Sequence, residues 1–138
     1  MKKISKIIVA ASALLLVASM AFAGGAQQKS KVQIGVVLPT KDEPRWIQDE
    51  TQFLKVLQGQ AGVELLFSQG DSGKEKQNVE ALLTKGIKVL IICPHDGTAA
   101  AAAAEAAKKE GVTVISYDRL ITDTTAVDYY VTFDSVSV

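Results

Sequence analysis

The chain has 138 residues with 15 basic and 15 acidic side chains. Without the three lysines of the first 23 residues, 12 basic residues remain against 15 acidic ones, a formal charge of −3, which argues against nucleic-acid binding. The single cysteine, Cys93, cannot form an internal disulfide, and we expect it to be a small buried side chain at a strand end.

The first 23 residues have the features of a secretory signal peptide. Three lysines form a basic start, residues 7–17 are apolar apart from one serine, and Ala21 and Ala23 precede the expected cleavage point. The apolar run is short for a membrane-spanning helix, although a retained anchor is the alternative. Cleavage would leave 115 residues, enough for one small core, beginning with a polar linker at residues 24–30.

Apolar runs of strand length alternate with helical patterns over residues 31–138. We expect strands at residues 32–38, 63–67, 88–93, 112–117 and 129–133. We expect helices from Pro44 to about Gln60, from the polar turn at 69–73 to Lys85, and over the alanine-rich residues 99–109, with Thr98 as the cap. The alternation with short connections predicts an open parallel α/β sheet flanked by helices.

Two clusters of unusual side chains follow the first and fourth expected strands. Arg45 and Trp46, with Lys41 before them, follow the first strand, and Asp118 and Arg119 follow the fourth. Ligands of open α/β sheets bind at the carboxyl ends of the strands, so these residues are candidates for one site.

The chemistry of these residues suits a neutral sugar, which needs apolar contact with its C–H face and oriented partners for its hydroxyls. Trp46 offers a flat apolar surface, and the forked donors of Arg45 and Arg119 can span two neighbouring oxygens. The Asp118 carboxylate can accept from two hydroxyls, and Lys41 adds a movable donor. In the duller alternatives, Trp46 packs in the core and Asp118 forms a surface ion pair with Arg119.

Longer segments carry a resemblance to a known family. They are Val-Gln-Ile-Gly-Val-Val-Leu-Pro-Thr-Lys at 32–41 with the following Arg45-Trp46, Gly-Ile-Lys-Val-Leu-Ile-Ile at 86–92, Asp96-Gly97, Gly-Val-Thr-Val-Ile-Ser-Tyr-Asp-Arg-Leu-Ile at 111–121 and Tyr-Tyr-Val-Thr-Phe-Asp at 129–134. Together they resemble the periplasmic sugar-binding proteins of ABC importers, most of all the xylose-binding and multiple-monosaccharide-binding branch.

The resemblance implies the first lobe of a type I periplasmic binding protein. Such a protein closes its two lobes around one monosaccharide and presents it to a membrane permease, in some members also to a chemoreceptor. It implies a periplasmic binding protein rather than an enzyme, with no cofactor or metal. By the same resemblance the sugar contacts are Arg45, Trp46, Asp118 and Arg119, with Lys41 as a secondary candidate.

Two neighbouring polar residues are not expected to bind the sugar. Asp96 is expected to cap the alanine-rich helix. His95 is expected to be an exposed loop residue rather than a metal ligand or general base, since no second ligand is in register with it.

The chain departs from the family pattern at its end. Family members are roughly twice as long or more, Ser135 stands where they usually have Asn, and this sequence stops at Val138. We therefore expect residues 31–138 to be a truncated amino-terminal lobe with marginal stability and an exposed apolar edge.

Two other functions share this kind of fold. An exported enzyme of flavodoxin-like or dinucleotide-binding architecture is disfavoured, because the first strand ends in Leu-Pro-Thr-Lys rather than a glycine-rich turn and no nucleophile with a base is visible. The effector domain of a sugar-responsive repressor is disfavoured by the export signal and by the absence of a DNA-binding helical pair from the sequence pattern.

Overall fold

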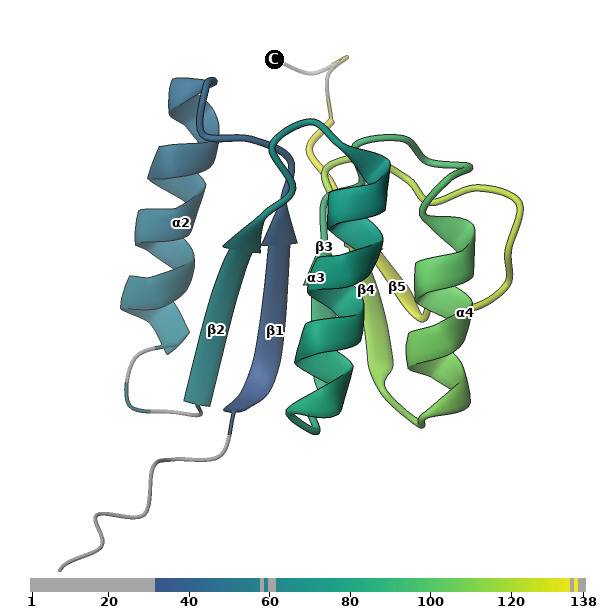
Figure 1. Ribbon diagram of the computed structural model, residues 1–138. Helices are drawn as coiled ribbons and strands as arrows, with labels where there is room; N and C mark the ends of the chain where they lie inside the picture. The colour runs from purple at the N-terminus through teal and green to yellow at the C-terminus, as the bar shows by residue number, and fades with distance from the viewer. Residues whose placement is uncertain (1–31, 58, 60–61, 135, 137–138) are drawn as a thin grey trace, which may run out of the picture.

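The computed structural model describes residues 32–57, 59, 62–134 and 136. The predicted signal peptide at 1–23, the linker at 24–30 and Ser135 lie outside these described residues. The elements in chain order are β1 (Val32–Leu38), α2 (Pro44–Leu57), β2 (Gly62–Phe67), α3 (Ser72–Thr84), β3 (Val89–Ile92), α4 (Ala101–Lys109), β4 (Thr113–Tyr117) and β5 (Tyr129–Val131), as Figure 1 shows.

The strands form one parallel sheet in the order β2-β1-β3-β4-β5. This confirms the predicted open parallel α/β sheet. The strand limits differ slightly from the prediction, since β2 already begins at Gly62 and β5 ends at Val131 rather than at residue 133. The structure describes helix α2 as far as Leu57, and the predicted end at about Gln60 lies outside the described residues.

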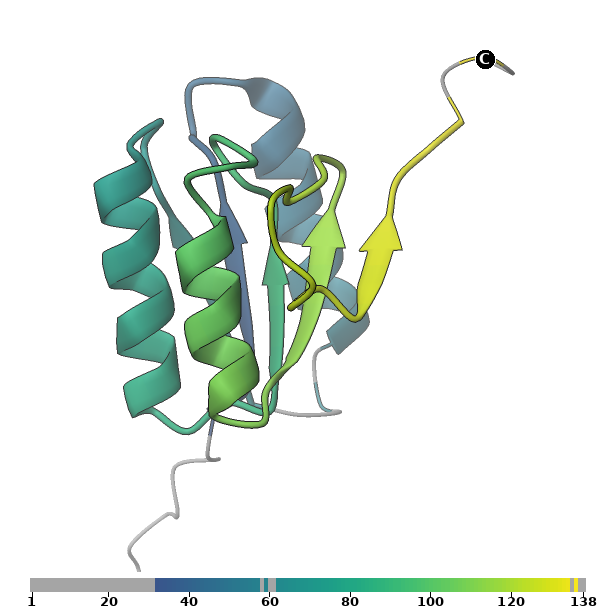
Figure 2. The same ribbon diagram turned by 90° about the vertical axis from the view of Figure 1, so that its right-hand side faces the viewer.

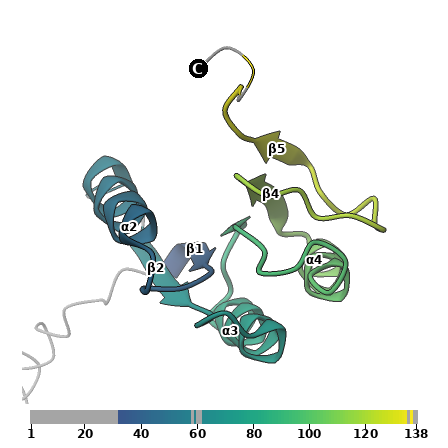
Figure 3. The same cartoon turned by 90° about the horizontal axis from the view of Figure 1, so that it is seen from above.

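The helices lie on both faces of the sheet, with α2 on one face and α3 and α4 on the other (Figures 2 and 3). The connection from β1 to β2 runs in one direction along the sheet, whereas the connections from β2 to β3 and from β3 to β4 run in the opposite direction. Right-handed crossovers therefore place α2 opposite the other two helices.

Each face of the sheet has its own apolar core. The core under α3 and α4 includes Leu82, Leu90 and Val114, together with the small alanine side chains of α4. The core under α2 consists of the buried residues Val36, Leu38, Trp46, Phe67 and Cys93. Cys93 is fully buried as predicted, and burial raises the pKa of its thiol to about 12.

The edge strand β5 leaves large apolar side chains in contact with solvent. Tyr129 is 63% exposed and Phe133, just beyond the strand, is 59% exposed. This confirms the exposed apolar edge that the sequence predicts. Among the helices that the structure describes, none is long and apolar enough to cross a bilayer.

The start of α4 differs from the sequence prediction. The helix begins at Ala101, two residues later than expected, and the Thr98 hydroxyl donates to the Asp123 carboxylate at 3.0 Å instead of capping the helix. The N–H of Ala99 donates to Asp96 Oδ1 at 2.7 Å, so Asp96 caps the turn that leads into α4. The prediction for Thr98 was wrong because the loop after β4 supplies a carboxylate that accepts its hydroxyl.

Gly35 allows β1 to lie close against α3. A Cβ atom at this position would lie 2.8 Å from Leu82 Cδ1 and 3.1 Å from Ile87 Cδ1. We expect Gly35→Ala to lower the free energy of unfolding by about 1–3 kcal/mol, because a close-packed core must rearrange to admit a methyl group. Urea denaturation followed by circular dichroism measures this loss.

The double variant Gly35→Ala/Leu82→Ala tests the cause of that loss. Its destabilisation should be smaller than the sum of the two single effects, since the new methyl group enters the space that Leu82 vacates. Strict additivity would contradict the steric explanation.

Candidate functional site

An ion pair joins the helix after β1 to the turn after β4. Arg45 lies in the first turn of α2, and its Nη2 donates to Asp118 Oδ1 at 2.8 Å. This hydrogen bond raises the pKa of Arg45 above its ordinary value. The Asp118 side chain is only 10% exposed and the Arg45 side chain 46% exposed, so the pair is partly shielded from water and the arginine stays accessible.

The backbone of Asp118 adopts a left-handed conformation with φ of 62°. Aspartate is among the few residues that tolerate this region. The neighbouring strand β5 fixes the conformation, because the N–H of Asp118 donates to the carbonyl of Val131 at 2.7 Å. The carbonyl of Asp118 accepts from the hydroxyls of Tyr130 at 3.0 Å and Thr132 at 3.1 Å.

Arg119 reaches back over the end of β3. Its Nη1 donates to the carbonyl of Pro94 at 3.3 Å, and its own carbonyl accepts from the Ser116 hydroxyl at 2.7 Å. The guanidinium carbon lies 5.4 Å from the centre of the Trp46 ring, while that of Arg45 lies 4.1 Å from it. Both arginines are thus within cation–π distance of the same indole.

The structure therefore brings together Arg45, Trp46, Asp118 and Arg119, as the sequence predicts. It also places the Trp46 side chain wholly in the core under α2, with no exposed surface. This burial matches the alternative in which the ring packs in the core, so a ligand would have to uncover the ring before stacking on it. A sugar contact by Trp46 stays a prediction.

Two buried polar atoms at this edge of the sheet lack partners. The indole N–H of Trp46 and the hydroxyl of Ser68 have no hydrogen-bond partner in the described part of the chain. Buried polar groups are almost always hydrogen-bonded, and leaving one unpaired costs about 1–3 kcal/mol. Such atoms mark a place where further polar partners would be stabilising.

Lys41 contacts a different set of residues. Its Nζ lies 4.6 Å from the centre of the Phe67 ring and 3.8 Å from Glu50 Oε1. The structure thus relates Lys41 to β2 and α2, and a sugar contact by this side chain stays a prediction.

His95 is exposed, as predicted from the sequence. Within residues 32–57, 59, 62–134 and 136, the His, Cys, Asp and Glu side chains form no group of three that could hold a metal ion.

Glu75 is a polar residue of this region that the sequence analysis missed. It lies in α3 with only 1% of its surface exposed, and its Oε2 accepts the backbone N–H of His95 at 2.8 Å. Burial raises the pKa of its carboxyl group to about 7. The available signal was its spacing, because Glu75 lies four residues before Val79 on the buried face of the helix.

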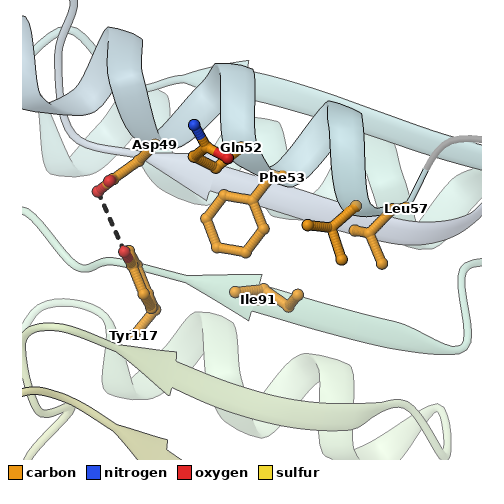
Figure 4. Close-up of a pocket in the computed structure, with 7 residues that line it drawn as sticks. Asp49, Gln52, Phe53, Leu57, Ile91 and Tyr117 are labelled. Carbon is orange, nitrogen blue, oxygen red and sulfur yellow. Dashed lines mark hydrogen bonds between the residues drawn. The ribbon is translucent and has the colours of Figure 1, made fainter.

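A cavity of about 300 Å³ lies between α2 and the sheet, beside the residues described above (Figure 4). Its lining is mostly apolar and comprises Asp49, Gln52, Phe53, Val56, Leu57, Ile91 and Tyr117. The Tyr117 hydroxyl donates to Asp49 Oδ2 at 3.1 Å, and burial raises the pKa of Tyr117 to about 12. None of the predicted sugar contacts Arg45, Trp46, Asp118 and Arg119 lines this cavity.

A parallel sheet with this strand order and polar side chains at its carboxyl edge defines a ligand-binding α/β domain. The model of the periplasmic binding protein domain family matches residues 34–138, and the chain belongs to this family.

The chain is similar in sequence to periplasmic sugar-binding proteins. It is 37% identical over 134 residues to the multiple sugar-binding periplasmic receptor ChvE of Rhizobium radiobacter, covering 96% of this chain and 38% of the receptor. It is 29% identical over 127 residues to the D-xylose-binding periplasmic protein of Escherichia coli, covering 91% of this chain and 38% of that protein.

A solved structure extends the comparison. A carbohydrate transporter solute-binding protein from Chloroflexus aurantiacus, in complex with D-glucose, matches with 74% sequence identity and a TM-score of 0.73. The match covers 78% of this chain and 32% of that protein. The match therefore spans between 32% and 38% of the length of these relatives.

Glu75 should make the stability of the chain depend on pH. Between the ordinary pKa of 4.5 and the folded value of about 7, the folded protein holds a proton that the unfolded chain has released. The free energy of unfolding should therefore fall as pH rises from about 5 to about 7 and then level off. Glu75→Gln should lack this slope and be more stable than the wild type at pH 8, by about 1–3 kcal/mol.

Thermal unfolding between pH 5 and pH 8 measures this difference. Glu80→Gln is the matched control, because Glu80 is exposed on the same helix and the substitution removes the same charge. Parallel pH profiles for the wild type and Glu75→Gln would show that the buried carboxylate is not the cause.

Proposed function

We propose that this chain is the amino-terminal, sugar-binding lobe of the solute-binding component of a monosaccharide ABC importer. The ligand would be a xylose-, glucose- or galactose-like sugar. The observation that carries the proposal is the convergence of Arg45, Asp118 and Arg119 around Trp46 at the carboxyl edge of the sheet. The names of the relatives, which include receptors and binding proteins for sugars, support the same class of ligand.

The ion pair at this edge suits an uncharged ligand with many hydroxyls. Asp118 and Arg45 largely neutralise each other, so the pair creates no strong demand for a charged ligand. A carboxylate accepts up to about four hydrogen bonds and a guanidinium donates five, so each retains capacity for a sugar hydroxyl after pairing with the other. The indole N–H of Trp46, which has no partner among the residues that the structure describes, would add a further donor once the ring is uncovered.

A site of this kind would also select a sugar over an analogue that lacks one of its hydroxyls. A ligand that lacks a hydroxyl would leave one of the shielded polar groups without a partner, and the cost of that group disfavours the analogue. The free-energy cost of losing a hydrogen-bond partner should be larger at Asp118 than at Arg45, because the Asp118 side chain is less exposed to water.

We extend the proposal to the path of the protein in the cell. Residues 1–23 would direct export to the periplasm and be removed, and the sugar-loaded protein would deliver its ligand to a membrane permease. A chemoreceptor would be a second partner of the sugar-loaded protein. The enzyme and repressor hypotheses gain no support from the relatives reported above, which are sugar-binding proteins of transport and reception.

Fluorescence of the single tryptophan provides a direct test of sugar binding. Titration of the purified chain with D-glucose, D-xylose, D-galactose, L-arabinose and D-ribose should give a saturable change for at least one of them. Asp118→Asn should weaken that binding by about tenfold or more, because hydrogen bonds to a charged acceptor contribute about 1.5–3 kcal/mol.

The matched control is Glu110→Gln, which removes one exposed carboxylate at the end of α4 and should leave the affinity unchanged. The Chloroflexus aurantiacus protein should be titrated in parallel. A response from that protein but none from this chain with any of the five sugars would refute sugar binding by this chain.

A further inference from the structure

Two oppositely charged side chains hold one peptide group from its two ends. The N–H of His95 donates to Glu75 Oε2 at 2.8 Å, and the carbonyl of Pro94 accepts from Arg119 Nη1 at 3.3 Å. These two atoms belong to the same planar peptide bond, since the carbonyl carbon of Pro94 is bonded to the nitrogen of His95. A single rigid unit thus connects a carboxylate of α3 to a guanidinium of the loop after β4.

The charges suit the polarity of this peptide. A peptide group carries a dipole of about 3.5 D whose positive end is at the N–H and whose negative end is at the carbonyl. A carboxylate at the N–H and a guanidinium at the carbonyl both stabilise that dipole, and linked hydrogen bonds polarise one another. Loss of the charge at Glu75 therefore weakens the acceptor that Arg119 uses.

We propose that Glu75 is a positioning residue for Arg119, and that through the Pro94–His95 peptide it holds the guanidinium beside Trp46 in the orientation that binds the sugar. This inference rests on the function proposed above. Glu75 itself is buried under the loop and does not contact the sugar in this mechanism.

The energetics of Glu75 distinguish this role from simple packing. A buried carboxylate is less favourable than a neutral side chain of the same shape, and its raised pKa records that cost. Glutamine would keep an acceptor for the His95 N–H without the charge. The geometry gives the charge a role, because the carboxylate accepts the N–H of the peptide whose carbonyl Arg119 binds.

The other charged groups around Glu75 come from three segments. Arg119 stabilises the ionised carboxylate, whereas Asp96, after β3, opposes it. Asp71 precedes α3, and its carbonyl accepts the backbone N–H of Glu75. The imidazole of His95 lies toward Gly70, where an added Cβ would be 3.8 Å from its Cε1.

The test compares sugar affinity between pH 6 and pH 8 in four proteins, using the sugar that gives the strongest fluorescence response. For the wild type, affinity should fall about three- to tenfold from pH 8 to pH 6, as expected for weakening one charge-assisted hydrogen bond. Glu75→Gln should show the lower affinity at every pH. Because this variant is also expected to be more stable at pH 8, weaker binding would not reflect a loss of folding.

Two control variants accompany it. Glu80→Gln removes an exposed charge from the same helix and should keep the wild-type profile. His95→Gln keeps the backbone N–H and removes the imidazole, and it too should keep the profile. Wild-type affinity and pH dependence in Glu75→Gln would overturn the proposal.

A measurement without sugar separates this proposal from the proposed function. The Nε–H resonance of Arg119, followed by NMR from pH 6 to pH 8, should shift in the wild type and stay constant in Glu75→Gln. A shift without sugar binding in any variant would support the positioning of Arg119 and overturn the sugar-binding function. Sugar binding with no dependence of Arg119 on Glu75 would overturn the positioning role alone.

Discussion

The parallel pairing of β1, β3 and β4 decides where chemistry can occur in this protein. Parallel strands end at the same edge of a sheet, and β3 lies between the other two. The segments that follow them therefore meet in order: Arg45 follows β1, Pro94 follows β3, and Asp118 and Arg119 follow β4. The ion pair between Arg45 and Asp118 crosses above β3 and ties the outer two segments together.

Several features at this edge are unfavourable by themselves. Asp118 adopts a left-handed backbone conformation, and Glu75 carries a buried carboxyl group. The indole N–H of Trp46 has no hydrogen-bond partner among the residues that the structure describes. The conformation of Asp118 is held by β5, because the N–H of Asp118 donates to the carbonyl of Val131 and the hydroxyl of Tyr130 donates to the carbonyl of Asp118. Energetically unfavourable features that gather in one region are typical of a functional site, because they persist only where the surrounding fold maintains them.

The two faces of the sheet are packed differently, and this bears on ligand binding. The face under α3 and α4 is closely packed, with no room for a methyl group at Gly35. The face under α2 has the apolar cavity of Figure 4, and Leu54 and Val56 of α2 are largely exposed. Arg45 and Trp46 therefore belong to the less enclosed helix, whereas Glu75 belongs to the firmly packed one. Fixing Arg119 from α3 gives the site an anchor on the more closely packed side.

The sequence alone determined the parallel sheet and the approximate limits of its elements, because apolar periodicity and strand ends are local properties of the chain. The same strand ends predicted that Arg45, Trp46, Asp118 and Arg119 would meet at one edge. Only the tertiary structure decided that Trp46 is buried, that Thr98 bonds to the loop after β4, and that Glu75 and Arg119 bind the same peptide group. Glu75 and His95 are separated by 20 positions, and Arg119 and Pro94 by 25. Contacts across such separations depend on which elements pack together, and no local pattern records that choice.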